Sequence, residues 1–192
     1  GGGVRTRSVA VTRRHNRASV LCEGQVVCAY DKRELPNYQV FDERRYFTPG
    51  NGVGVFEVEG VRVGLLICED AWFDEPARLA RDAGAQVLAV LNASPFHAGK
   101  GPEREQRMRE RVADSGLPLI YAHLVGGQDE VIFEGRSFAL NAQGETVARA
   151  EGFREAAMSV QVQAAASGVD VSAAPEALVP MASADAELWD AL

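Results

Sequence analysis

The chain has 192 residues, 46% of them hydrophobic and 24% charged, which is ordinary for one globular domain with a sizeable core. Its net charge of −7 argues against a nucleic-acid partner, because phosphate binding needs clustered Lys and Arg. No run approaches the roughly 18 apolar residues of a membrane helix and no apolar signal segment opens the chain, so we expect no membrane association and a reducing, cytoplasmic setting.

The first third of the chain is predicted to form two β-hairpins. ASVLCEGQVVCAY gives two short strands around a Glu-Gly turn, and GVGVFEV with VRVGLLI gives a second pair around Glu59-Gly60. VRVGLLI is almost continuously apolar, so we expect both faces of that strand to be covered. Cys22 and Cys28 do not face each other across the first turn, and we interpret both as structural thiols.

Strands and helices alternate after Cys68. EPARLARDAG is predicted to be a helix that Asp74 caps, with Pro76 in its first turn and Gly84 at its end. The strand QVLAVLN, the helix GPEREQRMRERVADSG and the strand PLIYAHLV follow, and VIFEG is expected to pair with RSFALNAQGETVA at the sheet edge. This order predicts an α/β layered fold that contains a mixed sheet.

The composition changes after Phe153. Residues 164–186 are dominated by Ala, Ser, Pro and isolated acids, which indicates a linker or an arm that wraps the surface, and AELWDAL reads as the beginning of a helix. We therefore divide the chain into an N-terminal segment over residues 1–17, a main domain over 18–163 and an arm over 164–192.

Cys68 lies where the apolar strand ends, directly before Glu69 and Asp70. The α/β folds present reactive groups at such strand ends, and backbone N–H groups of the following turn can stabilise an oxyanion. A buried cysteine is more commonly a small hydrophobic residue, so its position alone favours a structural thiol.

A thiol nucleophile also needs a proton acceptor and a cation or donors for the oxyanion. Among the histidines, we expect His15 to be solvated, His123 to be a hydrogen-bonded wall residue of its strand, and His97 to lack a companion acid at an informative distance. Lys32 is the other candidate. The segment after it, LPNYQVFDERRYFTPG, is rich in turn and aromatic residues, which is typical of a loop that lines a site.

Five motifs stand out along the chain: KRELPNY at 32–38, VFDERRYF at 40–47, LICEDAW at 66–72, NASPFH at 92–97 with Gly99-Lys100, and LVGGQDE at 124–130. In this order they resemble the nitrilase-type carbon–nitrogen hydrolases, and among these the glutaminase domains of glutamine-dependent NAD synthetases. The resemblance covers about residues 18–153. It implies a four-layer αββα sandwich, which here lacks its first strand and helix elements.

The resemblance also implies a Glu–Lys–Cys catalytic triad. Cys68 is then the nucleophile that attacks the side-chain amide of L-glutamine, and Lys32 stabilises the oxyanion together with the backbone N–H of Glu69. Glu43 matches the family's second glutamate, in the pattern E-x-x-x-F-x-P-G, and supports the lysine. The residues that fall in the family's glutamine pocket are Tyr38, Glu69 and Ser94, with Lys100 as a candidate for the substrate carboxylate.

The two ends of the chain depart from the family pattern. The general-base glutamate of the triad precedes the lysine by several tens of residues, and GGGVRTRSVAVTRRHN contains no glutamate, so we expect the isolated chain to be a poor hydrolase. AELWDAL resembles the helix that leads into a synthetase domain, so we expect a fragment cut at both ends. ATP and Mg would belong to that domain, with no cofactor and no metal for the hydrolase part, and we expect a homo-oligomeric full-length protein.

Three functions stay open. The first is the glutaminase part of an NAD synthetase, which supplies ammonia for the ATP-dependent conversion of deamido-NAD to NAD. The second is a stand-alone amidase or nitrilase that acts on another carbon–nitrogen bond. The third is a non-catalytic scaffold piece, which the missing base would favour.

Overall fold

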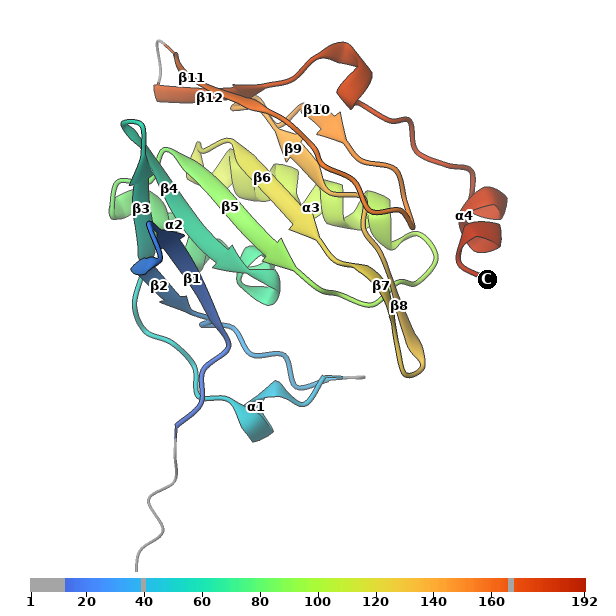
Figure 1. Cartoon of the computed structure of the whole chain (residues 1–192), viewed down its shortest axis with the longest axis horizontal. Coiled ribbons are helices and arrows are strands. Elements are labelled where there is room, and N and C mark those ends of the chain that lie inside the picture. The colour runs from blue at the N-terminus through green and yellow to red at the C-terminus, as the bar shows by residue number, and fades with distance from the viewer. Residues whose placement is uncertain (1–12, 39–40, 166–167) are drawn as a thin grey trace, which may run out of the picture.

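A six-stranded sheet lies at the centre of the computed structural model, which describes residues 13–38, 41–165 and 168–192 (Figure 1). Its strand order is β10-β9-β6-β5-β4-β3, with β4, β5 and β6 parallel and the outer strands antiparallel. The predicted α/β fold around a mixed sheet is therefore confirmed. The strands are β3 (Gly54–Val58), β4 (Val61–Ile67), β5 (Val87–Asn92), β6 (Leu119–His123), β9 (Phe138–Leu140) and β10 (Thr146–Arg149).

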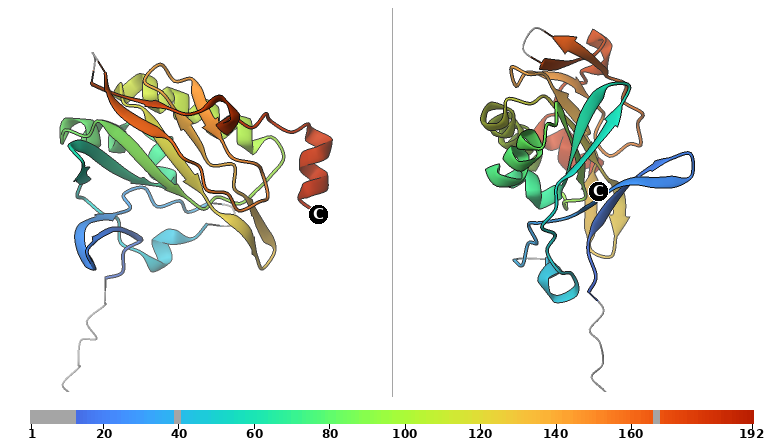
Figure 2. Two further views of the ribbon diagram at one scale, coloured as in Figure 1. Left: turned by 45° about the horizontal axis from the view of Figure 1, so that its top comes forward. Right: turned by 90° about the vertical axis from the view of Figure 1, so that its left-hand side faces the viewer.

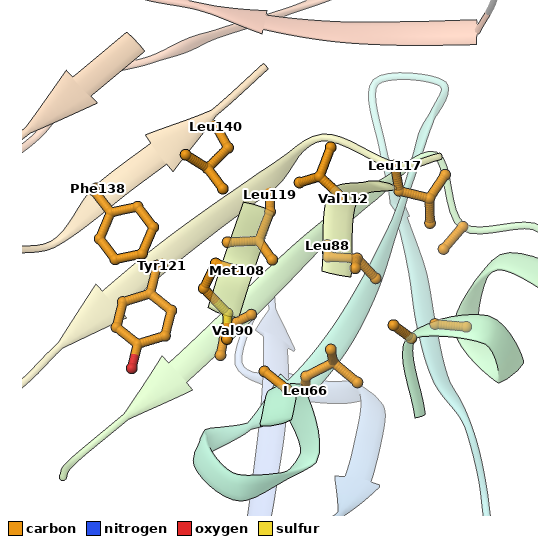
Figure 3. Packing of buried hydrophobic residues seen from close by; sticks show 14 residues of the cluster. Leu66, Leu88, Val90, Met108, Val112, Leu117, Leu119, Tyr121, Phe138 and Leu140 are labelled. Atoms are coloured by element: carbon orange, nitrogen blue, oxygen red, sulfur yellow. The ribbon is translucent and has the colours of Figure 1, made fainter. Parts of the chain in front are cut away.

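One face of this sheet is covered by the helices α2 (Asp74–Asp82) and α3 (Lys100–Ser115), as the right-hand view of Figure 2 shows. Every second residue of a strand points to the same face. Leu66, Leu88 and Leu119 are among the strand residues that face the helices, where they pack with Met108 and Val112 of α3 (Figure 3). The main hydrophobic core therefore lies between the parallel strands and the two helices.

Two separate segments cover parts of the other face. The hairpin of β1 (Arg17–Cys22) and β2 (Gln25–Asp31) packs Tyr30 against Leu65 and Ile67 of β4. The hairpin of β11 (Gln161–Ala165) and β12 (Gly168–Ser172) packs Val171 against Val87 of β5. Leu91, nearer the end of β5, keeps 45% of its surface exposed. Both faces of β4 are thus covered, as its apolar sequence predicts.

Both predicted hairpins form around left-handed turn residues. Glu23 and Gly24 have φ angles of 49° and 77°, and Glu59 and Gly60 have 47° and 81°. Two left-handed residues match the twist of the flanking strands, which favours a two-residue turn. Cys22 faces Gln25 and not Cys28 in this register, so the prediction that the two thiols do not face each other is confirmed.

Two predicted details are wrong. Asp74 does not cap α2: it is the first helical residue, and its carboxylate accepts a hydrogen bond from Arg78 one turn later, at 3.1 Å, while Phe73 takes the capping position. VIFEG does not pair with the segment after it. It forms β8 (Val131–Glu134), which pairs with β7 (Val125–Gln128) across a turn where Asp129 has a φ of 53°. The local turn decides this pairing.

The segment after β10 lies against the rest of the fold. The 3₁₀ turn η2 (Pro175–Ala177) and the helix α4 (Ala184–Asp190) follow β12, so the predicted final helix is confirmed. Arg136 donates to the Glu187 carboxylate of α4 at 2.6 Å, and both side chains are buried. The domain boundaries stay a prediction. In the described part of the chain, no helix has the length and apolar character needed to cross a membrane.

Gly64 sets how closely α2 approaches the sheet. A Cβ at this position would lie 2.9 Å from the Cβ of Ala85 and 3.0 Å from that of Ala80. We expect Gly64→Ala to lower the free energy of unfolding by about 1–3 kcal/mol through overpacking, measured by urea denaturation. Gly52→Ala is the matched control, because an added Cβ there meets nothing within 4 Å. Equal losses in the two variants would contradict this account of the packing.

Candidate active site

Cys68 opens a 3₁₀ turn, η1 (Cys68–Trp72), at the carboxyl end of β4. Its φ of 47° lies in the left-handed region, which residues other than glycine seldom adopt. Such a conformation costs about 1–3 kcal/mol and persists only where the surroundings hold it. The turn that presents the thiol therefore depends on other contacts.

The carboxylate of Asp70 supplies those contacts. Within the turn, it accepts the backbone N–H of Ile67 at 3.0 Å. From the segment around Lys32, it accepts the N–H groups of Arg33 at 3.0 Å and Glu34 at 2.8 Å, and the hydroxyl of Tyr30 at 2.9 Å. Burial raises the pKa of the Asp70 carboxyl, and these four donors oppose that rise. Asp70 thus fixes the Lys32 segment against the Cys68 turn.

Lys32 is only 1% exposed. Its Nζ lies 2.9 Å from each carboxylate oxygen of Glu43, which is the first residue of the short helix α1 (Glu43–Tyr46). A buried ammonium is stable only when it is paired and hydrogen-bonded. Lys32, Glu43 and Cys68 line one common hollow, so the structure brings together the three residues of the predicted catalytic set.

The environment of the Cys68 thiol acts on its pKa in both directions. Burial raises the pKa most, and the nearby carboxylates of Glu69 and Glu43 add to the rise. The Lys32 ammonium and the backbone N–H of Ala93 lower it, because both stabilise a thiolate. The net direction is upward, so the thiol is protonated at neutral pH and needs a proton acceptor before it can act as a nucleophile.

A cleft on one side of Cys68 contains all four predicted pocket residues, Tyr38, Glu69, Ser94 and Lys100. The hydroxyl of Tyr38 donates to Oε1 of Glu69 at 2.7 Å, and burial followed by this carboxylate raises the pKa of the phenol. The cleft therefore has an acidic wall at Glu69 and a basic wall at Lys100. Four further residues line the cleft, namely Phe41, Trp72, Pro95 and His97. The sequence assigned no role to the first three, and it made His97 a candidate only as a base.

A second hollow of about 390 Å³ also reaches Cys68. It is bordered by Lys32 and Glu43 on one side and by the half-exposed side chains of Leu91 and Leu124 on another. Its volume has room for several water molecules, each of which occupies about 30 Å³ in the liquid. Cys68 thus lines two hollows.

Buried polar side chains fix the segment that carries Ser94. Arg104 donates to the carbonyl oxygens of Ser94 at 3.2 Å and Pro95 at 3.3 Å, and to Oγ of Ser94 at 3.3 Å. Its charge is paired with Glu134, which is fully buried. Nothing in the spacing of these residues along the sequence predicted the network, because its members come from β8, α3 and the loop after β5.

Two of the histidines make hydrogen bonds within the fold. Nε2 of His123 accepts the N–H of Ser94 at 3.3 Å, and Nδ1 lies 2.6 Å from the carbonyl oxygen of Gly135, so the prediction of a hydrogen-bonded wall residue is confirmed. Burial, and then the charge of Arg104, lowers the pKa of His123 to about 4. The expectation for His15 is wrong: the ring is half-buried, with Nδ1 2.9 Å from the carbonyl oxygen of Thr48.

Within the described ranges, no group of three or more His, Cys, Asp and Glu side chains is arranged to hold a metal ion.

Comparisons with known proteins point to one family. The family model described as carbon-nitrogen hydrolase matches residues 7–170. The glutamine-dependent NAD(+) synthetase of Xylella fastidiosa is 47% identical over 143 residues, which are 73% of this chain and 26% of that protein. The chain spans about a quarter of the length of such relatives.

Solved structures agree with the sequence matches. Glutamine-dependent NAD+ synthetase from Acinetobacter baumannii, in complex with adenosine diphosphate, gives a TM-score of 0.85 at 34% identity, covering 96% of this chain and 34% of that one. A carbon-nitrogen hydrolase from Helicobacter pylori gives a TM-score of 0.64 at 31% identity, covering 71% of this chain and 52% of that one.

The role of Asp70 is tested by Asp70→Asn. An amide cannot accept the four hydrogen bonds without turning its NH₂ group toward a donor, so we expect a loss of about 3 kcal/mol in the free energy of unfolding. Urea denaturation measures it. Asp74→Asn, on the exposed first turn of α2, is the control and should change stability by less than about 0.5 kcal/mol. If Asp70→Asn were as stable as the parent protein, Asp70 would not be what fixes the Lys32 segment against the Cys68 turn.

The low pKa of His123 predicts acid sensitivity. Between the ordinary value of 6.5 and about 4, the unfolded chain binds a proton that the buried ring does not, so stability falls as pH drops through this window. The loss is on the order of 3 kcal/mol. We expect His123→Gln, which keeps an acceptor and a donor but does not titrate, to flatten this part of the profile. Urea denaturation at a series of pH values measures it, and parallel profiles for the two proteins would refute the assignment.

Proposed function

Since the chain belongs to the carbon–nitrogen hydrolase family, we propose that it hydrolyses the side-chain amide of L-glutamine through a thioester on Cys68. The observation that carries the proposal is the buried ammonium of Lys32, paired with Glu43 in the hollow that reaches the thiol. A buried cation held beside a nucleophile is suited to stabilise the negative charge that develops during acyl transfer. Glutamine is supported by the relatives, which are glutamine-dependent NAD synthetases.

In the first step the Cys68 sulfur attacks the amide carbon and the carbonyl oxygen becomes an oxyanion. The Lys32 ammonium and the backbone N–H of Glu69 stabilise this oxyanion. Glu43 keeps the ammonium in place, since its carboxylate holds Nζ at 2.9 Å. The C–N bond then breaks, ammonia leaves with the proton taken from the thiol, and a thioester remains.

Water hydrolyses the thioester to glutamate and restores the thiol. The hollow beside Cys68 supplies space for that water on the side bordered by Lys32. A base must carry the thiol proton to the leaving nitrogen and later activate the water. The family uses a glutamate for this role, and we assign none of the described residues to it.

The two charged walls of the cleft support an amino-acid substrate. Free glutamine carries an ammonium and a carboxylate, and each needs a partner of opposite charge. Glu69, held by Tyr38, is the partner for the ammonium, and Lys100 is the partner for the carboxylate. Ser94, whose hydroxyl accepts from Arg104, lines the same cleft.

The wider context remains part of the proposal. By the similarity to NAD synthetases, the released ammonia serves an ATP- and Mg-dependent conversion of deamido-NAD to NAD in a separate synthetase domain of a cytoplasmic, homo-oligomeric protein.

The helices on one sheet face and the β1–β2 hairpin on the other fit half of an αββα sandwich.

A stand-alone amidase or nitrilase is the second candidate, supported by the similarity to a solved amidase from Nesterenkonia sp., with a TM-score of 0.59 at 27% identity. A substrate panel separates the two. A glutaminase prefers L-glutamine over uncharged aliphatic amides, because these carry no charged group for Glu69 or Lys100 to bind.

The nucleophile is tested in the complete gene product that carries this chain. We expect Cys68→Ala to abolish glutamate release from glutamine and Lys32→Met to lower kcat by about 10²–10³, the usual cost of losing an oxyanion partner. An enzyme-coupled glutamate assay measures both. Cys22→Ser, at an exposed thiol, is the control and should keep full activity. Activity that survives Cys68→Ala would refute the mechanism.

Thiol alkylation checks the scaffold alternative in the chain itself. Because the pKa of Cys68 is raised, its modification by iodoacetamide should be slow at pH 7 and should accelerate beyond the ordinary thiol range. Removing the cation in Lys32→Met should shift this rise to still higher pH. Peptide mass spectrometry on the Cys68 peptide follows the reaction. A rate that does not depend on Lys32 would favour a non-catalytic thiol.

A further inference from the structure

The side chain of Trp72 forms the floor on which Lys100 rests. Nζ of Lys100 lies 4.2 Å from the centroid of the indole ring, and both residues line the cleft that contains Cys68. The Lys100 side chain is only 16% exposed, so little of it is free to move in water. An indole face attracts a cation electrostatically but offers it no hydrogen-bond acceptor.

The hydrogen bonds of Lys100 leave capacity for a ligand. An ammonium has three N–H donors. Among the described residues, the side-chain acceptor that Nζ contacts is Oε2 of Glu103, at 3.0 Å. Glu103 is 50% exposed on the first turn of α3, and an exposed ion pair of this kind is weak because water and salt screen it. A carboxylate that enters the cleft can therefore replace Glu103.

The neighbouring cation does not compete for this role. Arg107 lies about two turns further along α3. Its Cζ is 5.5 Å from the centroid of the same indole ring, but its guanidinium donates to Glu110 at 2.7 Å. Arg107 does not line the cleft. It holds the indole against α3, and Lys100 is left as the cation that faces the cleft.

We propose that Trp72 is a positioning residue that fixes the Lys100 ammonium at the cleft wall, and that the substrate carboxylate displaces Glu103 from it. This inference rests on the proposed glutaminase function and deepens it, because it assigns selection for a free carboxylate to Trp72 and Glu103. The Trp72 ring attracts the Lys100 ammonium without accepting hydrogen bonds from it. When the substrate carboxylate replaces that of Glu103, Lys100 still has an ion-pair partner. A substrate without the carboxylate gains nothing from the arrangement.

The decisive measurement is ligand binding to the complete gene product in a Cys68→Ala background, by isothermal titration calorimetry. The two probes are L-glutamine and L-glutaminamide, which has a neutral amide in place of the α-carboxylate. We expect Trp72→Leu to weaken L-glutamine binding about tenfold and to leave L-glutaminamide within about twofold. Trp72→Phe, which keeps an aromatic face, should recover most of the loss. Trp189→Leu, at an exposed indole on α4, should change neither affinity.

Turnover supplies the second measurement, with Cys68 present. Trp72→Leu should raise KM for glutamine about tenfold with kcat within about twofold, since the lost contact is made equally in the ground and transition states. Glu103→Gln should lower KM about two- to threefold, because the competing carboxylate is gone. A merely structural role for these residues would not improve binding in any variant.

The outcomes separate the two proposals. If the parent protein hydrolyses glutamine but Trp72→Leu weakens both probes equally, or if Glu103→Gln raises KM, the positioning role is wrong and the glutaminase function stands. If the Cys68→Ala protein binds L-glutaminamide as tightly as L-glutamine, selection by the carboxylate is refuted. If the parent protein neither binds nor hydrolyses glutamine, both proposals fall. Should Trp72→Leu not fold, the Glu103→Gln result decides alone.

Discussion

The hydrogen bonds of Asp70 join two parts of the chain that lie 36 or more residues apart. Its carboxylate receives two backbone N–H groups from the residues after Lys32 and one from the end of β4. A buried carboxylate that loses its donors becomes costly, so each of these hydrogen bonds supports the others. The left-handed backbone of Cys68 and the position of Lys32 both depend on this one group.

Two ion pairs also fix loop positions at this edge of the sheet. Glu43 neutralises Lys32, and Glu134 neutralises Arg104, which in turn holds the loop that carries Ser94. Each charge would be expensive to bury alone, so each pair allows only a narrow range of loop positions. The Lys32 segment, the Cys68 turn and the loop that carries Ser94 are thereby fixed where the parallel strands β4, β5 and β6 end. This is where α/β sheets commonly place their ligands.

The surroundings of Cys68 differ on its two sides. The cleft is lined by charged and aromatic side chains, whereas the second hollow is bordered by Leu91 and Leu124 and by the Lys32–Glu43 pair. Acyl transfer followed by hydrolysis needs both an oriented substrate and access for water. Under the proposed function, the cleft holds the substrate and the hollow admits water, with Cys68 lining both.

The sequence by itself determined the hairpins, the two long helices and the order of motifs that singled out Cys68, Lys32 and Glu43. Turn residues and hydrophobic periodicity act within a few positions of each other, so they can be read locally. Only the tertiary structure decided the network of Arg104 and Glu134 and the contact between Trp72 and Lys100. Asp70 belongs to both groups: its place after a buried strand was visible, but its four partners were not. Three of those partners lie 36 to 40 residues away, and only burial of the whole sheet edge brings them within hydrogen-bond distance.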